Sequence, residues 1–407
     1  MQLSPTTNSS DKKSTDSNNE RPLDLPFEAP SLLRVDPVVV LEGHGDRVWC
    51  VSWCPSANVL ASCSGDGTVK FWSCSRRAEM DENEEDSLTW KCIHTLKGEH
   101  SRTIRHVAWS PSGGWIACAS FDRTATVWKR SDDNPEGFEF ELEAVLDGHE
   151  SEVKCVSWST DDTLATCSRD RTVWIWDRVD VGEFECAGVL TGHVQDVKAC
   201  AWITPKEGGD KKPILLSCSY DNTIKVWTES HRRDDWYCFQ TLTRHEGTVW
   251  SIAVQPVEES IEELCTAVSK EHNFQPLICC CSDDGIVTFW ARNSEGKFHV
   301  LCTATGFAER SLYSVCWAPS KSGAFVACAS GDNKVTVLGL YHSRSDKEVH
   351  VDVVASVPCA HEADVNSVSF CPLVKKTVNE HGEEEDSFLL ASGGDDNMVR
   401  LWRVKKV

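Results

Sequence analysis

The sequence is short of basic residues and of long apolar runs. It carries 41 Lys and Arg against 63 Asp and Glu, which gives a net charge of −22. Such a charge argues against general binding to a phosphate backbone, because that binding needs clustered cations. No apolar run approaches the roughly 18 residues that cross a bilayer, and the first residues lack the apolar core of a secretory signal. We therefore expect a cytoplasmic protein that binds neither nucleic acid nor membrane.

Local motifs for catalysis or metal binding are also missing. The chain contains no phosphate-binding G-x-x-x-x-G-K-[ST] or G-x-G-x-x-G segment, and no nucleophile stands out beside a base. Its 21 cysteines include no C-x-x-C pair, so we expect no metal site and no cofactor. We interpret them as small buried apolar side chains in a reducing compartment. Seven of them recur in one apolar run of a repeated unit: Cys63, Cys118, Cys167, Cys218, Cys279, Cys281 and Cys328.

One stretch, residues 148–177, is the clearest copy of that unit. It opens with Gly148-His149 and closes with Trp176-Asp177. Between them lie three apolar runs, at 153–158, 164–167 and 173–176, separated by polar turns. Alternation at period two with turns between the runs predicts three short antiparallel strands.

The unit recurs along the chain with a constant spacing of six residues from a turn Asp to a closing Trp or Leu. The pairs are Asp66–Trp72, Asp122–Trp128, Asp170–Trp176, Asp221–Trp227, Asp284–Trp290, Asp332–Leu338 and Asp396–Trp402. An opening His recurs as His44, His100, His149, His193, His245 and His361. The sixth unit is degenerate, because Phe307 and Ala308 stand where the His would be. A Gly-His…Trp-Asp pattern at this period resembles WD40 repeats and predicts an all-β, seven-bladed propeller.

The two ends of the repeat predict how the ring closes. An apolar strand at 38–41 precedes the first Gly-His, and the last unit ends after its third strand at 402–404. Pairing these segments would complete the seventh blade and protect its edges. We expect a disordered leader over 1–36 and one propeller over 37–407, with polar insertions at 206–212, 257–275 and 374–387 as loops.

The recurring polar residues are assigned to the fold and not to catalysis. In WD40 repeats a His, a strand Ser or Thr, the turn Asp and the Trp indole form a buried hydrogen-bonded relay, and a set repeated in nearly every blade indicates structure. The members best matched here are His44, Asp66, Trp72, His149, Asp170, Trp176, His193, Asp221 and Trp227.

Function is instead expected at two aligned positions that the fold leaves free. The first follows the Val that starts each inner strand: Trp49, Arg105, Lys154, Lys198, Trp250, Tyr313 and Asn366. The second precedes the turn Asp: Gly65, Phe121, Arg169, Tyr220, Asp283, Gly331 and Asp395. Blades two to four would thus carry a basic patch bracketed by Phe121 and Tyr220, with Trp49, Trp250 and Tyr313 elsewhere on the ring. Exposed Arg with aromatic residues is the composition of an interaction hot spot.

At the level of whole blades the chain resembles the WD40 component of cytosolic iron–sulfur protein assembly. The resemblance covers essentially all of 38–404 and is carried by GHESEVKCVSW, LATCSRDRTVWIWD, HVQDVKACAW, SCSYDNTIKVW, DDWYC and HEGTVWS. It implies a non-enzymatic scaffold of the targeting complex that delivers [4Fe–4S] clusters to cytosolic and nuclear apo-proteins. The implied partners are a DUF59-type protein, a HEAT-repeat protein and an iron-only-hydrogenase-like cluster carrier. It also implies that Arg169, in the Ser-Arg-Asp turn, is a functional surface residue.

Two other readings remain open from the residues alone. A ubiquitin-ligase substrate receptor would carry Trp-Asp-x-Arg after a third strand, and Trp176-Asp177-Arg178-Val179 misses it by one position. A chromatin peptide reader would present an acidic channel, against which Arg105, Lys154 and Arg169 argue. An enzyme ranks last.

Overall fold

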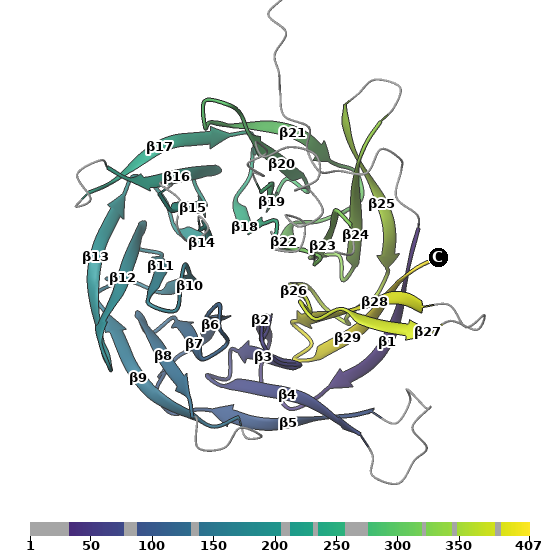
Figure 1. Cartoon of the computed structure of the whole chain (residues 1–407), viewed down its shortest axis with the longest axis horizontal. Helices are drawn as coiled ribbons and strands as arrows, with labels where there is room; N and C mark the ends of the chain where they lie inside the picture. The colour runs from purple at the N-terminus through teal and green to yellow at the C-terminus, as the bar shows by residue number, and fades with distance from the viewer. Residues whose placement is uncertain are drawn as a thin grey trace, which may run out of the picture.

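The computed structural model describes residues 32–76, 88–131, 138–204, 212–230, 235–256, 276–319, 323–343, 348–378 and 384–407. Within these ranges the regular secondary structure is all β, and its strands form seven antiparallel sheets. Figure 1 shows the sheets arranged as blades around a central axis, with one edge strand of each innermost and the other on the rim. The predicted seven-bladed propeller is therefore confirmed.

Six blades are each built from four consecutive strands, the first innermost and the last on the rim. Blade one is β2 (Val48–Trp53), β3 (Val59–Ser64), β4 (Val69–Arg76) and β5 (Leu88–Leu96), and blade two is β6 (Ile104–Trp109), β7 (Trp115–Ser120), β8 (Thr124–Arg130) and β9 (Phe140–Asp147). Blade three is β10 (Val153–Trp158), β11 (Thr163–Ser168), β12 (Thr172–Asp180) and β13 (Glu183–Thr191), and blade four is β14 (Val197–Ile203), β15 (Ile214–Ser219), β16 (Thr223–Glu229) and β17 (Trp236–Thr243). Blade five is β18 (Val249–Val254), β19 (Ile278–Ser282), β20 (Val287–Arg292) and β21 (Phe298–Ala304), and blade six is β22 (Leu312–Trp317), β23 (Phe325–Ser330), β24 (Val335–His342) and β25 (Val349–Val357).

The seventh blade joins the two ends of the chain. Its order is β26 (Val365–Phe370), β28 (Glu384–Gly394), β29 (Val399–Lys406) and β1 (Leu33–Leu41). The pairing of β1 with β29 runs from Leu33 opposite Lys406 to Leu41 opposite Val399. This confirms the predicted closure, but the strand is longer than expected: residues 33–36, assigned to the leader from the sequence, are part of it. Residues 1–31 of the predicted leader lie outside the described ranges.

One predicted loop is partly wrong. Within 374–387, Lys375–Val378 forms strand β27, which pairs with the start of β28 from Lys375 opposite Ser387 to Val378 opposite Glu384. The acidic run in β28 has low strand propensity, which is why composition suggested a loop. The insertions at 206–211 and 257–275 lie outside the residues that the structure describes.

The apolar core lies between neighbouring blades. For example, Val127 of blade two packs with Val156 and Leu164 of blade three in one buried cluster. The seven cysteines singled out above are all buried. The expectation that they fill the core is confirmed for these residues.

The polar relay is present in the six blades that carry the His. In blade three, His149 contacts Asp170 at 2.7 Å and Thr166 at 2.8 Å, and the Trp176 indole donates to Thr166 at 2.9 Å. Although burial opposes it, the hydrogen bond from His149 helps lower the pKa of Asp170 to about 2. The relay satisfies polar groups that burial would otherwise leave unpaired.

The hydroxyl of the relay comes from either of two strands. Where Ser or Thr is absent from the second strand, as at Cys118 and Cys280, a Thr on the third strand replaces it. Thus Thr126 and Thr288 accept from the indoles of Trp128 and Trp290 at 2.9 Å. These Thr residues stand directly opposite the two cysteines in the strand register.

The sixth blade replaces the relay with an ion pair. Asp332 there lies 3.2 Å from the Lys334 ammonium and accepts from the backbone N–H of Glu309 at 3.0 Å. Leu338 at the Trp position is fully buried. Apolar packing and this ion pair therefore stand in for the missing His and Trp.

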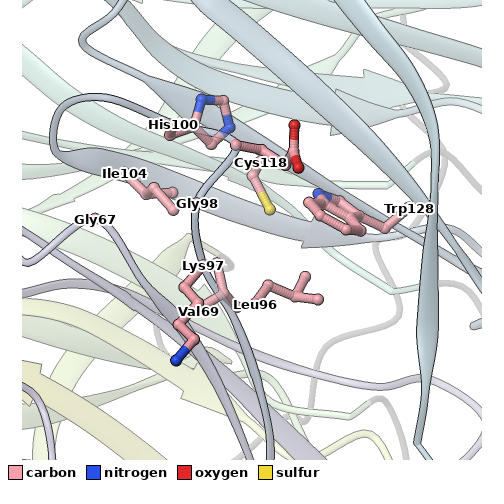
Figure 2. A pocket seen from close by; sticks show the side chains of 10 residues that line it. Gly67, Val69, Leu96, Lys97, Gly98, His100, Ile104, Cys118 and Trp128 are labelled. Atoms are coloured by element: carbon pink, nitrogen blue, oxygen red, sulfur yellow. The ribbon is translucent and has the colours of Figure 1, made fainter.

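The seam between blades one and two contains a small cavity near the relay of blade two. Figure 2 shows a cavity between blades one and two, lined by Gly67, Val69, Leu96, His100, Cys118 and Trp128. Its volume is about 10 Å³, which holds no more than about one water molecule. None of the described segments forms a helix capable of spanning a membrane.

Candidate partner-binding site

A β-bulge positions the first of the two aligned sets of residues. In every blade the pairing of the innermost strand with its neighbour shifts by one residue just after the first apolar residue. The residue at the shift is the one singled out from the sequence: Trp49, Arg105, Lys154, Lys198, Trp250, Tyr313 or Asn366. Bulges turn a side chain out of the regular alternation and commonly lie beside functional sites.

The second set is held at the same end of the blades. The backbone N–H of each member donates to the carbonyl of the residue just before the innermost strand. Examples are Arg169 to Glu152 at 2.9 Å and Tyr220 to Asp196 at 3.0 Å. The two positions of a blade thus lie next to each other on one face, which we call the bulge face: the face of the propeller that carries both aligned sets.

The structure brings the predicted cations and aromatic residues together. The Lys198 Nζ lies 3.7 Å from the ring centroid of Tyr220 and 4.3 Å from that of Trp250. The Lys154 Nζ lies 4.1 Å from the ring of Phe121. Cations over ring faces at these distances are attracted by the ring quadrupole.

The remaining aromatic residues extend this arrangement on both sides. Trp49 lies under the Arg105 guanidinium at 4.7 Å, and the Trp250 ring meets Tyr313 edge-on at 5.3 Å. Trp49, Trp250 and Tyr313 lie in other blades, as expected, but Trp49 and Trp250 contact cations of the patch and so belong to it. Bulged residues of adjacent blades are neighbours around a narrow ring, which a linear alignment does not show.

Arg169 contacts an acid that the sequence analysis did not include. Glu152 accepts from the Arg169 guanidinium at 3.2 Å and lies 3.6 Å from Arg102. A hydrogen bond from Ser151, together with the charges of Lys154 and Arg169, lowers the pKa of Glu152 to about 2. Arg102 itself lies over the Phe121 ring at 5.9 Å and donates to its carbonyl at 2.6 Å.

Glu152 belongs to a third aligned position, and Arg102 lies one residue before that position in blade two. Glu152 precedes the first Val of its inner strand, as Asp196 does in blade four and Asp364 in blade seven. Extending the alignment one or two residues toward the N-terminus would have found them. The patch therefore has mixed charge, with cations on rings and acids at its margin.

The surroundings of Lys154 and Lys198 disfavour their protonated, charged forms. Burial and the neighbouring charges of Arg105 and Lys154 lower the pKa of Lys198 to about 7. Burial also lowers the pKa of Lys154, while Glu152 opposes the shift. Like charges that are packed together and not fully neutralised repel one another. A bound anionic group would reduce that repulsion.

Exposure separates the members of the site. The side chains of Arg169 and Arg102 are 58% and 54% exposed, whereas the bulged lysines are half-buried. The two arginines are thus available for direct contact, whereas the two lysines are less accessible.

Two residues of the segment that resembles a ubiquitin-ligase receptor motif, Asp177 and Arg178, make contacts within the propeller. Arg178 forms an ion pair with Asp162 and lies 4.6 Å from the Trp115 ring, while Asp177 accepts from Thr163 at 2.7 Å. These contacts account for both residues without a partner.

One buried cluster also escaped the sequence analysis. The Sγ atoms of Cys155, Cys167 and Cys200 all lie within 4.8 Å of one another. They come from three strands of two blades, so no local spacing could have indicated them.

The repeats match a known family. The WD40 family, described as "WD domain, G-beta repeat", matches residues 35–73, 90–129, 140–177, 184–228, 236–291 and 354–403. The gap at 292–353 contains most of the sixth blade, which lacks the relay. Among solved structures, the WD40 β-propeller domain of Doa1 aligns with a TM-score of 0.59 at 18% identity, over 91% of this chain and 96% of that one.

Curated relatives narrow the family further. The chain is 35% identical to the "Probable cytosolic iron-sulfur protein assembly protein 1" of Candida glabrata, over 89% of this chain and 96% of that protein. It is 36% identical to the "Probable cytosolic iron-sulfur protein assembly protein Ciao1" of Culex quinquefasciatus, over 89% and 96%. The chain therefore belongs to the WD40 repeat proteins and, among them, to the cytosolic iron–sulfur protein assembly protein family.

Proposed function

We propose that this chain is a non-catalytic scaffold of the cytosolic iron–sulfur protein assembly machinery, and that it binds its partners through the bulge face. Relatives that share its full propeller are named for that process. Propellers of this kind present loops and rim residues to other proteins while the blades stay rigid. The work assigned to the chain is to hold partners and clients together during delivery of [4Fe–4S] clusters.

The observation that carries the site is the run of cations at one repeated bulge. Arg105, Lys154 and Lys198 occupy that bulge in three consecutive blades, whereas Asn366 fills it in blade seven. The fold accepts a neutral residue there, so the cations are not required to build a blade. Their clustering in a chain of net charge −22 supports a role in recognition.

The chemistry of the patch favours a partner that presents acidic and aromatic or apolar groups. Arg169 and Arg102 offer guanidinium groups for carboxylates, and the Trp250, Tyr220 and Phe121 rings offer apolar surface. Elsewhere the acidic chain repels acidic proteins, which directs them to this face. Among the expected partners, a DUF59-type protein and the ends of apo iron–sulfur clients are assigned here.

A HEAT-repeat protein and an iron-only-hydrogenase-like cluster carrier are proposed as further members of the assembly. The proposed compartment is the cytoplasm, with the nucleus as a second one because clients work there.

Affinity purification of the tagged full chain from its own cells tests this function. We expect mass spectrometry to identify a DUF59-type protein and a HEAT-repeat protein in near-stoichiometric amounts. Recovery of ubiquitin-ligase adaptor subunits in their place would contradict the proposal and favour a substrate receptor.

A further inference from the structure

Three buried thiols meet below the bulge face, at the seam of blades three and four. Cys155 lies on β10, Cys167 on β11 and Cys200 on β14, and their Sγ atoms are within 4.8 Å of one another. Each thiol also points toward a backbone carbonyl: Cys155 to Cys200 at 3.9 Å, Cys167 to Val197 at 3.6 Å and Cys200 to Ala165 at 3.8 Å. Thiols are weak donors, so these long contacts hold the group loosely.

A histidine from blade two lies near one member of this group. His106, on β6, interacts with the thiols of Cys155 and Cys50. Its Nδ1 atom is fully buried and has no hydrogen-bond partner among the described residues. A buried polar nitrogen without a partner calls for an explanation, and a metal ion is one of the few available.

The residue types at this position differ between the two halves of the ring. In blades five and six, Ser251 and Ser314 stand two residues after the start of the inner strand, and each hydroxyl accepts from a backbone N–H of the next blade. In blades one to three the same position holds Cys50, His106 and Cys155. These side chains are metal-ligand types, and they replace a hydroxyl that the fold uses elsewhere.

We propose that Cys155, Cys167 and Cys200 bind a single thiophilic cation of the zinc class at this seam, and that His106, beside Cys155, moves in as the fourth ligand. Three thiolates and one imidazole form a closed tetrahedral set typical of structural zinc. With Zn–S bonds of about 2.3 Å, two thiolates on one zinc stand about 3.8 Å apart. The observed limit of 4.8 Å therefore requires inward shifts of well under 1 Å at each sulfur, whereas His106 lies outside that limit and its ring must move further.

Binding involves no redox step. Each thiol releases its proton to solvent as its sulfur forms a bond to the cation, and the His106 imidazole donates the lone pair of a ring nitrogen. The centre then carries one net negative charge, from three thiolates and a dication. Lys154 and Lys198 lie one and two residues from Cys155 and Cys200, so their charges favour that centre.

The site would tie together the strands that carry the partner-binding residues. Cys155 follows Lys154, Cys167 lies two residues before Arg169, and Cys200 lies two residues after Lys198. Because all three sulfurs are buried, the cation must enter during folding and not by diffusion into the folded chain. This inference does not depend on the identity of the partners.

The test uses the full chain refolded with zinc or with Co²⁺ and then freed of unbound metal. We expect about one cation per chain by elemental analysis. The Co²⁺ form should show thiolate charge-transfer absorption and the d–d bands of tetrahedral cobalt. Refolded chain without bound cation, or cobalt bands of octahedral oxygen ligation, would overturn the proposal.

Variants assign the ligands. Cys155→Ala and Cys167→Ala should lose the cation, whereas Cys281→Ala should keep it. Cys281 is equally buried and occupies the place of Cys167 in blade five, which makes it a matched control. His106→Asn should keep the thiolate band while releasing the cation to a chelator at least about ten-fold faster. Equal loss in Cys281→Ala, or full retention in Cys155→Ala and Cys167→Ala, would overturn the assignment.

Discussion

The Lys198 ammonium lies between two aromatic rings, 3.7 Å from the centroid of Tyr220 and 4.3 Å from that of Trp250. Each contact gains cation–π attraction, but the site also removes water from the ammonium and places Arg105 and Lys154 nearby. Desolvation and this repulsion weigh against the charged form and lower the pKa of Lys198 to about 7. A bound anion would reverse that balance, which links this residue to recognition.

The lowered pKa of Lys198 predicts a pH dependence of stability. The usual pKa of about 10.4 applies to the unfolded chain, so between about pH 7 and pH 10 the unfolded state binds more protons than the folded state. The contribution of Lys198 should therefore make the free energy of unfolding increase as the pH rises through this window. Lys198→Met keeps the apolar stem and should flatten that rise.

Denaturant unfolding of both proteins at about pH 6.5 and pH 9 measures the effect. The gain on raising the pH should be smaller in Lys198→Met than in the native chain. An equal gain in both would show that Lys198 titrates normally in the folded state.

The relay of blade three predicts a stability cost. Asp170→Ala leaves the buried His149 without its 2.7 Å partner, and we expect a loss of roughly 2–4 kcal/mol in the free energy of unfolding. Asp332→Ala in blade six is the control, because its partner Lys334 keeps a second carboxylate, that of Glu309 at 3.3 Å. That change should cost less than about 2 kcal/mol. Equal losses by chemical denaturation would argue against a special role for the His relay.

Ring closure predicts a sharp boundary for truncation. Removing residues 1–31 should leave the melting temperature unchanged. Removing residues 1–41 takes away β1, exposes the edge of β29 and uncovers the buried Leu33 and Leu41. We expect that chain to melt at least several degrees lower or to aggregate, as followed by scanning calorimetry. A stable, monomeric chain lacking 1–41 would contradict closure by the N-terminal strand.

Much of the fold follows from the sequence because each blade repeats the same chemistry. The constant step from Asp170 to Trp176 and the recurring His149 predict the strands, the turn and the relay together, since all three residues must meet in one blade. The same pattern identified the weak sixth blade through Leu338. The strand β27 was missed because pairing by Lys375–Val378 depends on a partner and not on its own composition.

The candidate site was only partly predictable. Alignment found Lys154 and Arg169 because the fold does not require them. It could not show that Trp49 lies under Arg105, since the bulges of different blades meet only once the ring closes. The cluster of Cys155, Cys167 and Cys200 was invisible for a related reason: its members come from three strands and share no local spacing.

Arg169 is the proposed partner contact that a binding measurement tests most directly. Binding of a purified DUF59-type protein to the native chain, to Arg169→Glu and to Lys297→Glu can be compared by calorimetry. Lys297 is the matched control, because its side chain is 59% exposed, as Arg169 is 58% exposed, and it follows β20 at the opposite end of the blades. We predict that Arg169→Glu folds normally and weakens Kd by about 30-fold, or about 2 kcal/mol, while Lys297→Glu binds like the native chain. Native affinity in Arg169→Glu, or an equal loss in Lys297→Glu, would contradict the bulge face as the binding site.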